Sequence, residues 1–155
     1  MFLQFLDILM SNPFVIERNS MKFPKLFQDF IRLGITGWCI EILFTACNSL
    51  RRREMALKGT TSLWMFPIYG TGALIGPLSH VLKRYSTAFR GIIYMLLIFV
   101  VEFLSGRFLT NHKICPWNYA KSGWNIREVI RLDYAPWWFL TGLLFERMTA
   151  SKEIG

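Results

Sequence analysis

The sequence predicts an all-α fold: a polytopic membrane protein built as a four-helix transmembrane bundle, with a second helix broken by proline and glycine. Three observations predict it. The hydrophobic residues, 53% of the chain, come in long runs instead of recurring at period 2 or 3.6. Clusters of Lys and Arg separate these runs, as at membrane boundaries. The run from Leu63 to Leu82 concentrates prolines and glycines.

A length of 155 residues suits one domain. We expect a single transmembrane domain over residues 26–148, with spans at about 26–50, 63–82, 89–109 and 129–147. Residues 1–25 are expected to form an N-terminal linker or an interfacial segment, and an open alternative is that the first twenty precede a start at Met21. Residues 149–155 form a tail.

The first and third apolar runs are the strongest candidates for spans. The first continues from Gly34–Leu50 into Arg51–Arg53, whose long side chains can reach lipid headgroups. At its start, Asp29 and Arg32 are spaced i and i+3, which predicts that they neutralise each other on one helix face. The third run carries no charge from Gly91 to Val101.

The second run contains too many helix breakers for a plain helix: Pro67, Gly70, Gly72, Gly76 and Pro77. In one interpretation, Gly72 and Gly76 form a small-residue face that lets another helix approach closely. In the other, residues 67–72 interrupt the helix, and the freed backbone groups line a polar cavity. The two interpretations are compatible.

The fourth run is short. From Tyr134 to Phe145 it covers only about 18 Å as a helix, against about 30 Å of hydrocarbon. Either the helix starts earlier and takes Arg131 and Asp133 into the membrane as a pair, or the preceding loop folds back into the protein. The sequence NIREVIRL, residues 125–132, predicts a short amphipathic helix before this span.

The net charge of +8 favours anionic lipid headgroups of the bilayer as partners over nucleic acid, because the basic residues flank apolar runs instead of striping one helix face. A homo-oligomer and a partner subunit both fit. No cofactor motif and no metal site is recognised, since three cysteines and two histidines offer no paired ligand spacing. The 18 Lys and Arg residues divide evenly between the two sides, so no orientation is predicted.

Two carboxylates inside apolar spans are the candidate functional groups. Glu41 lies in the first span and Glu102 in the third, and in an alternating bundle these spans run in the same direction. Their positions along the two spans differ by about two residues, or about 3 Å of rise, so both acids are expected at similar depth. Buried there, they could hold a proton, a cation or a cationic group. The structural alternative is that each pairs locally, for instance Glu102 with Arg107.

Five short motifs stand out along the chain: Gly37-Trp38-x-x-Glu41, Pro67-Ile68-Tyr69-Gly70-x-Gly72, Glu102-x-x-x-Gly106, Pro116-Trp117-Asn118-Tyr119 and Trp138-x-x-x-Gly142. Taken together they resemble the family known as Putative ABC-transporter type IV, or CmpB-like, membrane proteins, and within it the branch that includes transmembrane protein 229. The resemblance covers about Phe27 to Met148. It implies a small multi-pass integral membrane protein. It also implies that Glu41, Tyr69, Glu102, Trp117 and Tyr119 fall on characteristic positions of the family. Asn118 stands where the family motif has Asp, which removes a carboxylate from that loop.

The leading functional hypothesis is a transport-associated, permease-like protein with an intramembrane acidic site for a cation or a cationic or polar solute. The expected binding residues are Glu41, Glu102, Tyr69, Arg107, Trp117, Asn118 and Tyr119, with Gly72 and Gly76 for helix packing. Two alternatives remain open: a membrane-embedded enzyme or binder acting on a lipid headgroup, and a non-catalytic scaffold subunit. No catalytic residue set is recognised, which favours a non-enzymatic role.

Overall fold

Helices make up most of residues 25–150, the part of the chain that the computed structural model describes. In order they are α2 (Lys25–Arg51), α3 (Met65–Gly70), α4 (Ile75–Leu82), α5 (Thr87–Asn111) and α6 (Ala135–Thr149). Two 3-10 helices, η1 (Thr71–Leu74) and η2 (Leu132–Tyr134), precede α4 and α6. Two short strands, β1 (Asn125–Ile126) and β2 (Ile130–Arg131), pair antiparallel. The expectations for residues 1–24 and for residues 151–155 lie outside the described residues.

Both α2 and α5 are long and apolar enough to cross a membrane. The core helix of a soluble protein passes the same test, but such a helix is mostly buried, whereas only 22% of the apolar window of each helix is buried here. On α5 the exposed side chains form a stripe at four-residue spacing: Leu96, Val100, Leu104 and Phe108. Such a stripe is unfavourable in water and favourable in lipid. The shorter remaining helices leave the four-span bundle a prediction.

The same hydrogen-bonded capping motif ends both long helices, α2 and α5. Glu54 N–H donates to Ser49 O at 3.0 Å, and Ile114 N–H donates to Leu109 O at 3.0 Å. These six-residue closures are Schellman motifs, which place the residue after the helix in the left-handed region. In α2 that residue is Arg53, at φ 60°, and in α5 it is Lys113, at φ 58°. The positive side chains at these ends also complement the helix dipoles.

The broken second helix is continuous in direction. Thr71, which follows α3, and Ile75, which follows η1, both keep right-handed helical dihedrals, so η1 tightens the helix without unwinding it. Pro77 has no N–H to bond the carbonyl of Ala73, which explains why regular α-helical bonding fails just before α4. The break expected from the sequence is therefore present as a 3-10 turn.

Glycines bring the helices close together at aromatic side chains. A Cβ added at Gly37 would meet the Tyr69 side chain, and one added at Gly91 would meet the Phe139 ring. At Gly142 the nearest atom is Tyr94 Cβ at 2.5 Å. The hydrophobic core lies beside these contacts and comprises Leu33, Ala73, Ile75, Leu82, Tyr94 and Phe145.

The prediction of an amphipathic helix at NIREVIRL, residues 125–132, is wrong. This segment forms the β1–β2 hairpin instead. Arg127 and Glu128 take φ 50° and 63°, which makes a tight turn that a helix cannot contain. Val129 is buried, and its carbonyl accepts a hydrogen bond from Trp117 Nε1 at 3.1 Å. Thus the loop before the fourth run folds back onto the protein, and α6 begins only at Ala135.

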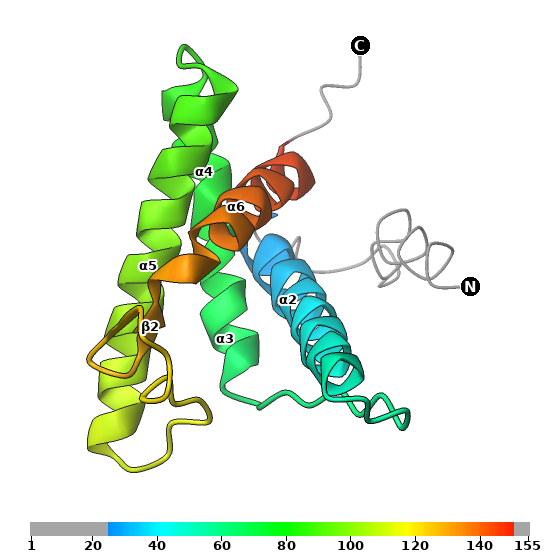
Figure 1. The fold of residues 1–155 in the computed structure, drawn as a ribbon. Coiled ribbons are helices and arrows are strands. Elements are labelled where there is room, and N and C mark those ends of the chain that lie inside the picture. The colour runs from blue at the N-terminus through cyan, green and yellow to red at the C-terminus, as the bar shows by residue number, and fades with distance from the viewer. Residues whose placement is uncertain (1–24, 151–155) are drawn as a thin grey trace.

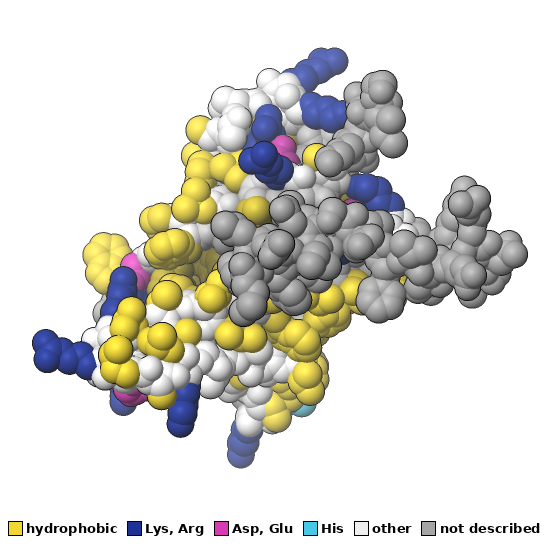
Figure 2. Space-filling model, turned by 90° about the vertical axis from the view of Figure 1, so that its right-hand side faces the viewer, with side chains coloured by type: hydrophobic (Ala, Val, Ile, Leu, Met, Phe, Trp, Pro, Cys, Tyr) yellow, Lys and Arg dark blue, Asp and Glu magenta, His cyan; other side chains and the backbone are white. Residues whose placement is uncertain are grey.

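In space, α2 and α5 run in the same direction, with the α3–η1–α4 segment between them and α6 crossing close to both (Figure 1). The hairpin lies against the C-terminal half of α5. Figure 2 shows hydrophobic side chains across the middle of one face, with Lys and Arg side chains mainly above and below them. This arrangement places an internal space between the C-terminal halves of α2 and α5.

Candidate functional site: a cavity with two carboxylates

A cavity of about 630 Å³ lies between α2, α3, η1, α4, α5 and α6 and two of the connecting loops. Most of its lining is apolar or aromatic. Among the described residues that line it, the charged ones are Glu41 and Glu102, and no Lys, Arg or His belongs to the lining. The two acids that the sequence singled out therefore share one internal space.

Glu102 projects from α5 and is only 8% exposed. Its Oε2 accepts a hydrogen bond from Trp138 Nε1 at 3.1 Å, and its Oε1 accepts a longer one from the Tyr119 hydroxyl at 3.5 Å. Burial raises the pKa of Tyr119, and the neighbouring Glu102 raises it further, so this hydroxyl stays protonated and able to donate. The carboxylate is held by two donors, with aromatic rings around it.

Glu41 projects from α2 and is positioned by the following loop. The Thr61 hydroxyl donates to Glu41 Oε2 at 2.5 Å. The loop is fixed in turn to α2 by Thr45, whose hydroxyl oxygen accepts from Thr60 N at 2.8 Å, and by Trp38, whose Nε1 donates to Ser62 O at 2.9 Å. Residues 60–62 thereby form a polar part of a lining that is mostly apolar and aromatic.

Aromatic rings form much of the remaining wall. Tyr69 enters from α3, where its ring lies over Gly37 and meets the Phe145 ring edge-on at 6.5 Å between centroids. Trp117 and Tyr119 enter from the loop before the hairpin. The loop's own hydrogen bonds, from Trp117 Nε1 to Val129 O and from Tyr119 N to Glu128 O, fix these two side chains in place.

Two of the expected binding residues do not line the cavity. Arg107 lies on α5 beyond Gly106, and among the described contacts Glu102 pairs with Trp138 and Tyr119, not with Arg107. Asn118 is exposed, and its Oδ1 accepts from Ala120 N at 2.7 Å in a local turn. Its side chain supports the loop shape, and its neighbours Trp117 and Tyr119 reach the cavity.

The expected packing glycines face α6. A Cβ at Gly72 would lie 2.5 Å from the Phe145 ring, and one at Gly76 would lie 3.1 Å from Thr149 Cβ. Gly72 also lines the cavity. The small-residue face thus packs within the chain, against residues one helical turn apart on α6.

Sequence reasoning missed Trp138 and Thr61 as partners of the two acids, and Phe44 and Tyr134 as wall residues. For Trp138 a signal existed, because it opens one of the motifs that carry the family resemblance. Thr61 carried no such signal: its contact depends on a loop that folds back along α2.

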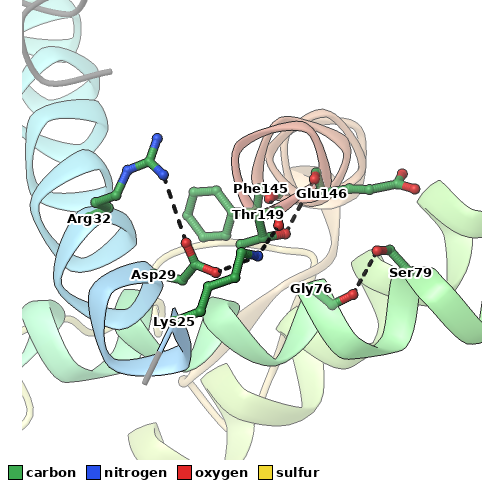
Figure 3. Close-up of polar contacts among 8 residues, drawn as sticks. All are labelled: Lys25, Asp29, Arg32, Gly76, Ser79, Phe145, Glu146 and Thr149. Atoms are coloured by element: carbon green, nitrogen blue, oxygen red, sulfur yellow. Dashed lines mark hydrogen bonds and ion pairs between the residues drawn. The ribbon is translucent and has the colours of Figure 1, made fainter. Parts of the chain in front are cut away.

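A second polar group lies at the N-terminal ends of α2 and α5, away from the cavity. Asp29 is 5% exposed and pairs with Lys25 at 3.1 Å and with Arg32 at 3.8 Å, which confirms the expected Asp29–Arg32 pair (Figure 3). Lys25 Nζ also donates to Thr149 O at 2.5 Å. Nearby, Arg90 Nε pairs with Glu146 Oε1 at 2.9 Å. These contacts tie α6 to α2 and α5 and close that end.

In the comparison with known proteins, a family model described as “Putative ABC-transporter type IV” matches residues 29–152. No solved structure matches the chain. The matched range includes both carboxylates, the broken helix and the aromatic loop. The narrower resemblance to the branch with transmembrane protein 229 stays a prediction.

Proposed function

Since the chain belongs to the Putative ABC-transporter type IV family, we propose that it is a multi-pass, transport-associated membrane protein that binds a cation or a cationic solute in the cavity between α2 and α5. The family name and the two long apolar helices indicate a membrane protein. The cation site and the permease-like role are our proposal.

Four crossings are supported by the lengths of the helical segments. Together α3, η1 and α4 form one helical segment that is continuous in direction from Met65 to Leu82, about 27 Å long if every residue rises 1.5 Å. The segment formed by η2 and α6, from Leu132 to Thr149, contains the same number of residues as the segment from Met65 to Leu82. Both approach the about 30 Å of a hydrocarbon core. On the face shown in Figure 2, Lys and Arg side chains lie mainly above and below the hydrophobic side chains. A protein that crosses a bilayer would place them there, next to the lipid headgroups.

The charge of the cavity carries the functional proposal. Its described lining holds two carboxylates and no basic side chain, so its electrostatic potential favours a positive occupant. A carboxylate in a low-dielectric site without a cationic neighbour is unfavourable, and a bound cation relieves that cost. The scaffold alternative would use Gly72 and Gly76 against a partner, but here both pack against the chain's own α6.

The test is binding of simple cations to the purified full chain in lipid nanodiscs, measured by calorimetric titration with K⁺, ammonium and tetramethylammonium chlorides. At least one should bind, and Glu102→Gln should weaken it by about tenfold or more, because the change removes the Coulombic attraction between the cation and a buried carboxylate. Glu54→Gln is the matched control, since Glu54 is exposed outside the cavity. Unchanged binding in the Glu41→Gln/Glu102→Gln double variant would refute the proposal.

A further inference from the structure

Resting on the proposed function, we propose in addition that the cavity is built for an organic cation with a methylated ammonium group, and not for a metal ion or a bare ammonium ion. The argument uses the size of the cavity, the donors already bound to its carboxylates and the arrangement of its rings.

The cavity is too large and too poor in ligands for a dehydrated metal ion. Its volume of about 630 Å³ falls in the range of about 300–1,000 Å³ that small organic molecules occupy. Hard cations need six or more oxygen ligands in close array. Within the described part of the chain, no group of three or more His, Cys, Asp or Glu side chains could hold a metal ion. An apolar body attached to the charge would fill the remaining space.

Four aromatic rings form a cluster, called the ring cluster below, on the cavity wall beside Glu102. Tyr134 is nearly perpendicular to each of three neighbours: to Phe44 at 84°, to Tyr119 at 85° and to Trp138 at 89°, with centroids 5.4–6.2 Å apart. All four rings line the cavity. Ring faces that line a cavity attract quaternary ammonium groups through cation–π attraction. The Arg131 guanidinium, which is not part of the lining, lies 4.5 Å from the Tyr134 ring centroid, so one ring of the cluster already makes a cation–π contact.

The hydrogen bonding of the acids favours a methylated over a bare ammonium. Each oxygen of Glu102 already accepts a hydrogen bond, and one oxygen of Glu41 is bound by Thr61. A bare ammonium ion brings several N–H donors that need acceptors, whereas a methylated one brings apolar methyl groups that pack on ring faces. The absence of Lys and Arg from the described lining also leaves a lipid phosphate without a partner there, so a free solute fits better than a choline headgroup.

The experiment titrates tetramethylammonium, ammonium and K⁺ chlorides against the full chain in nanodiscs without choline lipids. Tetramethylammonium should bind at least about tenfold more tightly than the other two. Phe44→Leu keeps an apolar side chain but removes a ring of the cluster, and should weaken tetramethylammonium binding about tenfold. Phe108→Leu, the same change on the outward face of α5, should leave binding unchanged. Trp137→Leu, at an exposed part of the lining, repeats the test if Phe44→Leu fails to fold.

The outcomes test the cation site and the methylated-ammonium assignment separately. Equal or tighter binding of K⁺ or ammonium, still dependent on Glu102, overturns the methylated-ammonium assignment and leaves the cation site standing. Binding of none of the three cations overturns both. Displacement of tetramethylammonium by lysophosphatidylcholine as readily as by choline supports the ring cluster as the ammonium site and overturns the preference for a free solute over a choline headgroup.

Discussion

Substitution of Gly142 by Ala should destabilise the protein through the seam between α5 and α6. A Cβ at this position would lie 2.5 Å from Tyr94 Cβ, and Tyr94 is fully buried at 0% exposure. Because the obstructing atom is a Cβ and not the end of a flexible side chain, the two helices must separate to accept the methyl group. Overpacking of this kind costs about 1–3 kcal/mol, and the better helix propensity of alanine returns up to about 1 kcal/mol. The expected net loss is about 1–2 kcal/mol.

Thermal unfolding in one detergent, followed by tryptophan fluorescence, measures this loss as a decrease in Tm of roughly 3–6 °C. Two alanine substitutions serve as matched controls. At Gly76 the nearest atom is 3.1 Å away, on Thr149, so the contact and the propensity gain should nearly cancel. At Gly123 nothing lies within 4 Å, and no loss is expected. A Gly142→Ala protein as stable as wild type, or a Gly76→Ala protein equally damaged, would refute the reasoning.

Three further predictions follow from polar contacts and backbone geometry. Glu146→Gln should lower stability by about 1–3 kcal/mol in denaturant titrations, because it leaves the partly buried Arg90 without its ion pair, and the Arg90→Met/Glu146→Met double variant should recover most of the loss. Arg131 Nη2 pairs with Asp133 Oδ2 at 2.6 Å, and the pair stabilises the fold only while the Asp133 carboxylate is charged, so its contribution disappears when that carboxylate is protonated in acid. The difference in Tm between wild type and Asp133→Asn should therefore be constant near neutral pH and vanish in strong acid, whereas a difference that grows in acid would contradict this sign. Glu128→Gly relieves a residue held at φ 63° while keeping its N–H, and should raise stability by about 0.5–1 kcal/mol in the same assay, so a loss would show that the turn depends on the side chain.

The helix positions followed from the sequence because the apolar runs and the basic clusters are long-range composition signals. The first helix ends at Arg51, and the break in the second falls at Thr71–Leu74, within the region where prolines and glycines gather. The hairpin at residues 125–131 was not predictable from the amphipathic spacing alone. Its conformation depends on two left-handed residues, Arg127 and Glu128, and neither is a residue type that usually signals such a turn.

The candidate site, like the fold, was predictable from the sequence only in part. Same-direction spans and similar depth led to the expectation that Glu41 and Glu102 share an interior, and both line one cavity. Whether they bind a solute stays a prediction. Arg107 was chosen because it follows Glu102 by five residues. Asn118 was chosen because it belongs to the loop motif of residues 116–119, and neither side chain lines the cavity. The partners Thr61 and Trp138 come from other segments, and contacts across such separations leave no local pattern.

The bond between the Lys25 ammonium and the Thr149 carbonyl joins the first and last turns of the helical domain. Because these two turns are adjacent, the chain enters and leaves the domain at nearly the same place. A fluorescent protein split into two halves, one fused ahead of Lys25 and one after Ala150, should therefore reassemble on a single folded molecule.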